Sequence, residues 1–229
     1  MQATVEFDPS YSLLTIDLTA GESIKAEPGA MVAQQGVAMS TGMSGSGGLF
    51  GGIRRMMGGE SFFVNTFTAE AAGGWVSLAP PAPGDIGSFD LEPGTNLFLQ
   101  SSSFLAGTGN VQIDSQFQGF RGFFSGESLF FIRAYAQQGT GTVYYNSFGA
   151  IKQVAVHPGQ ELVVDTGHLV AFSDDVEYSI GKVGGIRSLI AGGEGLVMKF
   201  RGNGTVWVQT RNLAALAEKL NPFLPKRGQ

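Results

Sequence analysis

The sequence contains no cysteine, which excludes disulfides, thiolate nucleophiles and zinc sites built on cysteine. Charge is also scarce, since Asp, Glu, Lys and Arg make up 14% of the chain against roughly 25% in average soluble domains. The few basic residues are spread thinly, and the densest basic clusters are pairs such as Arg54 with Arg55. Nucleic-acid binders gather lysine and arginine on one face to contact phosphates, so nucleic acid is not expected as a partner.

Long apolar stretches are missing as well. No run approaches the ~18 residues of a membrane-spanning helix. The opening residues, MQATVEFDPSYSLLTIDL, have neither the basic start nor the unbroken apolar stretch of a signal peptide. The sequence therefore predicts a cytoplasmic protein that is at most peripheral to a membrane.

Glycine, by contrast, is abundant, with 35 residues, and it is accompanied by 18 phenylalanines. This combination is typical of many short strands joined by tight turns. Segments such as LLTIDL, VQIDSQF, VEYSI and TVWVQT alternate apolar with polar residues, as half-buried strands do. SFFVNTF, SLFFI and GLVMKF are continuous apolar runs, which predict strands buried on both faces.

An internal repeat is the clearest pattern. A Gly-Glu pair followed by an apolar segment places Glu60, Glu127 and Glu194 at equal intervals, because 127 − 60 and 194 − 127 are both 67. Other landmarks recur in phase with these glutamates. Each unit has a turn glycine, an alanine twelve residues later and a valine in its last strand. These residues are Gly21, Gly94 and Gly159; Ala33, Ala106 and Ala171; Val76, Val143 and Val206.

The repeat predicts an all-β fold. We expect one domain of three tandem, β-sandwich-like units with boundaries near 11–83, 84–149 and 150–211, packed in a pseudo-threefold arrangement, because one unit cannot bury both faces of its sheet alone. A short helix over 212–220 is predicted to follow, with Asn212 as its cap and Asn221-Pro222 as its end. That helix should pack on the last unit or on a neighbouring subunit.

The segment GGLFGGIRRMMGGESFF, the PG-x-x-L openings and the GGE-x-L of the third unit resemble the family of mitochondrial-biogenesis proteins called "altered inheritance of mitochondria", in its bacterial form. The resemblance covers nearly the whole chain. It implies a fold like that of the tryptophan RNA-binding attenuation protein, with threefold character and frequent oligomers. It also implies a link of mitochondrial relatives to inner-membrane organisation, and it carries over no catalytic residue.

The charged residues of the repeat are the first candidate site. Arg54, Arg121 and Arg187 precede the three Gly-Glu pairs and would form one ring, with Glu60, Glu127 and Glu194 as a second. The favoured interpretation is that each Glu closes its own unit through turn donors or an Arg. The alternative is an axial ion-binding site.

The glycine-rich segment between Gly42 and Gly59 is the second candidate. It lacks the Gly-Lys-Ser/Thr ending of a phosphate-binding loop. Its apolar residues beside two arginines are typical of a membrane or partner contact, although the same positions in the third unit read as core. The residues of this hypothetical contact are Leu49, Phe50, Ile53, Arg54 and Arg55.

Metal and nucleophilic chemistry have weak support. His157 and His168 are the only histidines. With Asp165 or Glu161 they could form only a weak metal site, because metal ligands normally come as a set of three or more. Ser125 occupies a position that is glycine in the other units, so it is a turn residue and not a nucleophile.

We therefore predict no cofactor, no metal and no enzyme activity. The sequence favours a homo-oligomeric assembly or scaffold protein that presents a surface to protein partners or a membrane. The alternative is a small-ligand-binding β-protein with a pocket between repeats.

Overall fold

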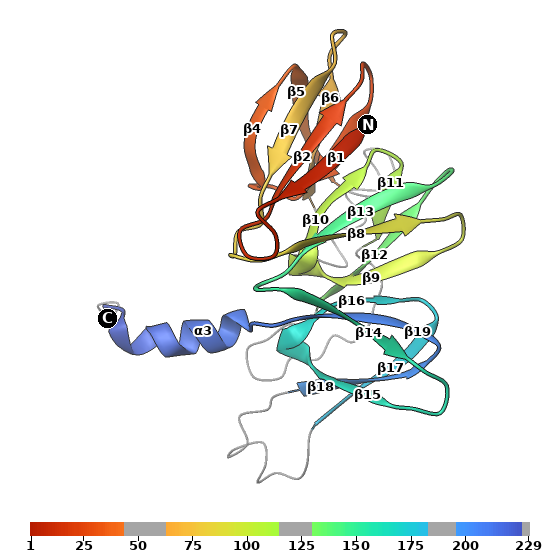
Figure 1. Cartoon of the computed structure of the whole chain (residues 1–229), viewed down its shortest axis with the longest axis vertical. Coiled ribbons are helices and arrows are strands. Elements are labelled where there is room, and N and C mark those ends of the chain that lie inside the picture. The colour runs from red at the N-terminus through yellow and green to blue at the C-terminus, as the bar shows by residue number, and fades with distance from the viewer. Residues whose placement is uncertain (44–62, 115–129, 183–195, 226–229) are drawn as a thin grey trace.

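The computed structural model describes residues 1–43, 63–114, 130–182 and 196–225. Within these ranges the chain is almost entirely antiparallel β-structure, with one short α-helix at its C-terminal end (Figure 1). The prediction of an all-β protein with a C-terminal helix is confirmed. After β1 (Gln2–Glu6), eighteen strands follow in three groups of six. We call these groups the first, second and third sets.

The first set is β2 (Leu13–Leu18), β3 (Ser23–Ala26), β4 (Met31–Gln35), β5 (Val37–Met43), β6 (Phe63–Ala69) and β7 (Gly74–Leu78). The second set is β8 (Ile86–Leu91), β9 (Asn96–Gln100), β10 (Phe104–Thr108), β11 (Val111–Asp114), β12 (Phe131–Ala136) and β13 (Gly141–Asn146). The third set is β14 (Ile151–Val156), β15 (Leu162–Asp165), β16 (Leu169–Ser173), β17 (Val176–Lys182), β18 (Leu196–Gly202) and β19 (Gly204–Gln209).

One pairing scheme holds in all three sets. The sixth strand pairs with the first and the third, and the fifth strand pairs with the second and the fourth. Neighbouring sets join where the second strand of one set pairs with the third strand of the next, as β3 with β10 and β9 with β16. We call these two pairs the internal junctions.

The described strands therefore form four sheets of unequal size. Two six-stranded sheets span the internal junctions, with the orders β5-β6-β3-β10-β13-β8 and β11-β12-β9-β16-β19-β14. The ends of the molecule carry a four-stranded sheet, β1-β2-β7-β4, and a three-stranded sheet, β15-β18-β17. In Figure 1 the three sets follow one another along the long axis, and no pair of described strands closes the third set onto the first. A pseudo-threefold arrangement around a common centre thus stays a prediction.

Local geometry recurs with the pairing. The turn glycines Gly21, Gly94 and Gly159 have φ of 80°, 87° and 81°, the left-handed region that residues with a Cβ disfavour. Each third strand is interrupted by a register shift of the same kind, just before Ala33, Ala106 or Ala171. The sequence landmarks therefore mark positions where the backbone itself is constrained.

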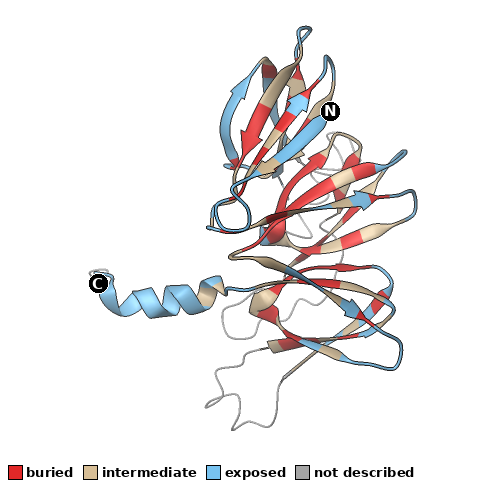
Figure 2. Ribbon diagram, viewed as in Figure 1, coloured by how far each residue is buried: buried red, intermediate tan, exposed pale blue. Residues whose placement is uncertain are grey.

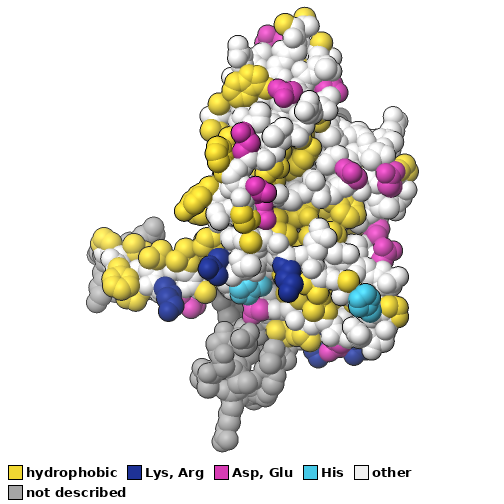
Figure 3. Space-filling view, in the orientation of Figure 1, with side chains coloured by type: hydrophobic (Ala, Val, Ile, Leu, Met, Phe, Trp, Pro, Cys, Tyr) yellow, Lys and Arg dark blue, Asp and Glu magenta, His cyan; other side chains and the backbone are white. Residues whose placement is uncertain are grey.

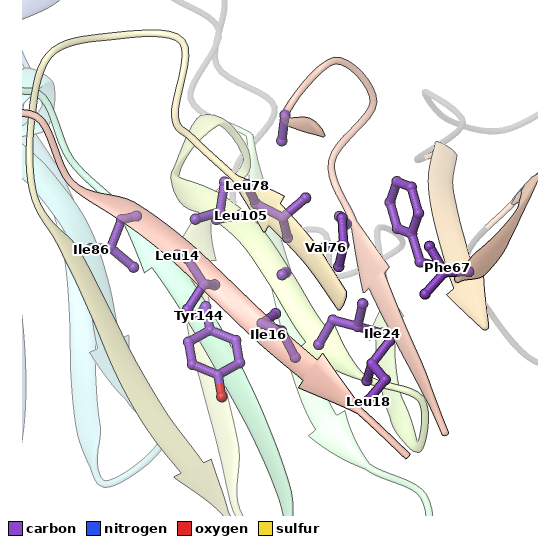
Figure 4. Packing of buried hydrophobic residues seen from close by; sticks show 14 of the residues in the cluster. Leu14, Ile16, Leu18, Ile24, Phe67, Val76, Leu78, Ile86, Leu105 and Tyr144 are labelled. Atoms are coloured by element: carbon purple, nitrogen blue, oxygen red, sulfur yellow. The ribbon is translucent and has the colours of Figure 1, made fainter. Parts of the chain in front are cut away.

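The buried residues form three clusters, and each cluster draws on more than one set. The first combines Leu14, Ile16 and other residues of the first set with residues of the second, including Ile86, Leu105 and Tyr144 (Figure 4). In the second cluster, Val170 and Trp207 of the third set complete the core of the second set. In the third, Phe131 of the second set packs with third-set residues. Burial of each set therefore depends on its neighbour.

The fifth strands bear out one prediction in part. The sequence predicted burial on both faces of SFFVNTF, SLFFI and GLVMKF. Successive side chains of a strand point to opposite faces, and in β12 both Phe131 and Ile132 are buried, in different clusters. In β6 the side chains of Val64 and Phe67, also on opposite faces, are buried, whereas Asn65 and Thr66 are half-buried. Each fifth strand therefore buries residues on both faces, but the burial is not continuous along either face.

The C-terminal helix α3 (Leu213–Leu220) begins as predicted, because the Asn212 side chain accepts a hydrogen bond from the Ala215 backbone N–H. The first of the two predicted contacts, with the last unit, is wrong, since no residue of the helix is buried (Figure 2). The second, with a neighbouring subunit, stays a prediction. Its leucines stay exposed and line one side of the helix (Figure 3). Among the described residues, no helix has the length and apolar character that crossing a membrane requires.

Candidate assembly interface

The third strand of the first set, β4, differs from its counterparts. Phe104, Leu105 and Ala106 of β10 are 0% exposed, and so are Leu169, Val170 and Ala171 of β16. The matching residues of β4 are Met31, Val32 and Ala33. Met31 is 41% exposed and Val32 is 59% exposed, and every residue of β4 is exposed (Figure 2). The same kind of side chain is thus covered in two sets and uncovered in one.

The cause is the missing partner strand. β10 and β16 each lie between a sixth strand and the second strand of the preceding set. β4 pairs only with β7, so its other edge has no described partner. The fourth strands β5, β11 and β17 also lie at sheet edges, but they do so at the same place in each set. β4 is an edge where the scheme elsewhere has an interior strand.

The third set has the complementary edge. Among the described strands, its second strand, β15, pairs with β18 alone, whereas β3 and β9 each pair with a third strand as well. Val163 of β15 is 47% exposed. β4 and β15 lie at opposite ends of the long axis (Figure 1). We call them the terminal edges.

The internal junctions show what such a contact contains. Lys25 of β3 reaches across the first junction and donates a hydrogen bond from Nζ to the backbone oxygen of Val111, at 2.7 Å. Partial burial lowers the pKa of Lys25. The backbone N–H of Glu27 donates to the oxygen of Leu105 at 2.9 Å. Backbone pairing and apolar cover, with few charges, hold the sets together.

Glu27, beside the first junction, is expected to make the stability of the fold depend on pH. Burial raises the pKa of its carboxyl from 4.5 to about 7. A raised folded-state pKa means that the stabilising contribution is full below pH ~4.5 and is lost as pH rises through about 7. Because solvent screens part of this effect, the free energy of unfolding should fall by about 1–2 kcal/mol between pH 5 and pH 8. Glu27→Gln is expected to abolish this loss, measured as the free energy of unfolding in urea at both pH values.

Glu218→Gln, on the exposed helix, is the control and should show the same difference between pH 5 and pH 8 as wild type. A Glu27→Gln protein that also keeps the wild-type difference would contradict the assignment.

The predicted charged rings and the predicted contact loop lie outside the described residues. This holds for all ten positions: Arg54, Arg121, Arg187, Glu60, Glu127, Glu194, Leu49, Phe50, Ile53 and Arg55. Their roles stay predictions.

The two histidines are not brought together as ligands. His157 is exposed beside a turn, and Nδ1 of His168 lies 2.8 Å from the backbone oxygen of Gln209. The proposed carboxylate partners serve other groups. Glu161 bonds Arg201, and Asp165 accepts from the N–H of Gly167. No cluster of three or more metal-ligating side chains occurs in the ranges that the structure describes.

Two of the hollows on the described surface each belong to one set. One is lined by residues of β2, β7, the end of β4 and the adjoining turns, including Asp17, Gln35 and Trp75. The other is lined by charged and polar residues of β17 and β18 and by Glu161, just before β15. Neither lies between sets, where the ligand-binding alternative places its pocket.

Comparison with known proteins identifies the family. The family model described as "Mitochondrial biogenesis AIM24" matches residues 4–211, nearly the whole β-structure. The chain belongs to this family. The predicted resemblance is therefore confirmed, and within the family the chain is similar to bacterial members.

Two streptococcal relatives support the assignment. An uncharacterized protein of Streptococcus pyogenes serotype M6 is 33% identical over 233 residues, covering 98% of this chain and 92% of the relative. The X-ray crystal structure of a Streptococcus pyogenes protein matches with a TM-score of 0.77 and 32% identity, covering 97% of this chain and 99% of that one. The family and its fold thus extend along the full length of the chain, while neither relative's description states an activity.

The sequence did not single out the terminal edges. The signal was present, because the MVA of β4 occupies the phase of FLA and LVA, which are core. Repeat phase shows which residues correspond, but a strand's burial depends on a partner that the sequence of one copy cannot reveal.

Proposed function

We propose that this chain is a non-catalytic, homo-oligomeric scaffold built from three copies of one β-unit. The observation that carries the proposal is the exposure of Met31 and Val32 on β4, at positions where both other sets bury their residues completely. An apolar strand with an open edge is an aggregation hazard unless another strand covers it. A second copy of the chain is the simplest cover, because each copy brings a matching edge.

The scaffold would display surfaces for further partners. The exposed apolar residues of α3 (Leu213, Leu216 and Leu220), with Phe223 just after it, favour contact with a protein or a membrane surface. Lys219 in the last turn adds a positive charge beside this apolar side. A cytoplasmic location, taken from the sequence, belongs to the same proposal.

Native mass spectrometry tests the oligomer. The purified chain should give a multimer whose mass is constant over at least about a hundredfold range of concentration, because edge pairing with a buried apolar strand yields a stable interface. It should carry no bound small molecule. A monomer throughout the range would contradict the scaffold, and a stoichiometric copurifying ligand would favour the ligand-binding alternative.

A further inference from the structure

We infer that β15 of one copy pairs antiparallel with β4 of the next copy, so that the chains assemble head to tail. This inference rests on the proposed homo-oligomer and specifies its contact. A third strand pairs with a second strand at both internal junctions, and both pairings are antiparallel. The first copy offers β15, a second strand with one edge open among the described strands, and the next copy offers β4, a third strand with one edge open in the same sense.

Joining the terminal sheets restores the sheet seen twice inside the chain. The internal sheets have the order fourth, fifth, second, third, sixth and first strand. The three-stranded sheet ends in β17-β18-β15 and the four-stranded sheet begins β4-β7-β2. Placed side by side, they reproduce the same six-strand order, with β1 added beyond β2. The two incomplete sheets are halves of one complete sheet.

The internal junctions also fix the register. Ala106 lies opposite Ala26 and Gly107 opposite Lys25; in the second junction Ala171 lies opposite Leu99. Leu162 lies three residues after its turn glycine, as Ile24 and Leu97 do. The corresponding contact between copies therefore places Ala33 opposite Val164, Gln34 opposite Val163 and Gln35 opposite Leu162.

The chemistry of the two edges fits this register. Val163, at the position of Lys25 and Phe98, is apolar and exposed, and Gln34 is an exposed neutral residue opposite it. Neither edge strand brings a like charge to these three pairs. Met31 and Val32 would gain the cover that Leu105 and Val170 have inside the chain. The contact is heterologous, so a multimer of constant mass corresponds to a closed ring of copies, and not to a symmetric dimer.

Cysteine pairing tests the contact without background, because the chain has no cysteine of its own. Gln34→Cys and Val163→Cys are made as separate proteins, each expected to fold because both positions are exposed. After unfolding, mixing, refolding and mild oxidation, the mixture should give disulfide-linked dimers of one copy of each variant. Consecutive antiparallel pairs alternate between wide and narrow spacing, so Ala33→Cys with Val164→Cys is the second pair. At least one of the two pairs should cross-link in high yield.

The controls separate the failure of this contact from the failure of the oligomer. Each variant alone should stay uncross-linked, because head-to-tail pairing never places two identical positions together. A native multimer in which Gln34→Cys cross-links to itself would overturn the head-to-tail contact and leave the oligomer standing. A native multimer with no disulfide in either mixture would also overturn it. A monomer at every concentration would overturn both the contact and the proposed function.

Discussion

Val32→Glu is expected to convert the oligomer into monomers while leaving the fold of each chain intact. Val32 is 59% exposed in the single chain, so the glutamate side chain can stay in water there. In the assembly the same side chain would be covered, as Leu105 and Val170 are. Burial of an unpaired charge costs about 3–5 kcal/mol, which weakens association at least about 100-fold.

The measurement is sedimentation velocity of wild type and variant at matched concentrations, with the melting temperature of each. Ala3→Glu is the matched control, because Ala3 is exposed on β1, at the opposite edge of the same four-stranded sheet. This control should remain assembled. An assembled Val32→Glu protein would show that β4 is not the covered strand, and a variant that loses its secondary structure would show that Val32 already supports the single chain.

Phe172→Ala is expected to destabilise the fold by about 3–5 kcal/mol, the second large effect. Phe172 of β16 is 1% exposed and lies in a ring cluster. Its ring centroid is 5.1 Å from that of Phe98, 5.3 Å from Phe200 and 5.7 Å from Phe131. Phe98 and Phe131 belong to the second set, so truncation leaves a cavity at the second internal junction as well as in the third set.

Urea denaturation gives the free energy of unfolding for this comparison. Phe172→Leu refills most of the volume and should cost less than the alanine variant. Phe223→Ala, at a residue 84% exposed, should stay within about 0.5 kcal/mol of wild type. A loss below about 1 kcal/mol for Phe172→Ala would mean that the aromatic cluster does not hold the second and third sets together.

The parts of the fold that depend on local physics were predictable. Turn glycines could be found because a left-handed backbone excludes a Cβ, and Gly21, Gly94 and Gly159 share it. The cap of α3 could be found because the first backbone N–H groups of a helix need an acceptor, and the side chain of Asn212 supplies one. The valines of the last strand of each unit, such as Val76 and Val206, are fully buried as their alternation predicts.

Properties that depend on non-local pairing were missed. The apolar content of β6 and β18 does not tell how completely each face is covered, because that depends on what lies against each face of the strand. The exposure of α3 is a second example, since the apolar side of the helix predicts a contact but does not identify the surface that it contacts. The terminal edges are the third, because β4 and β10 both begin with two large apolar residues and an alanine, and this shared pattern does not show what lies beside each strand.

The mass-spectrometric identity of the disulfide-linked peptides decides the central claim most directly. In the mixture of Gln34→Cys and Val163→Cys chains, the account predicts a single cross-linked species that joins the β4 peptide of one chain to the β15 peptide of another. Linked peptides from two identical strands, in a chain that still assembles, would contradict it.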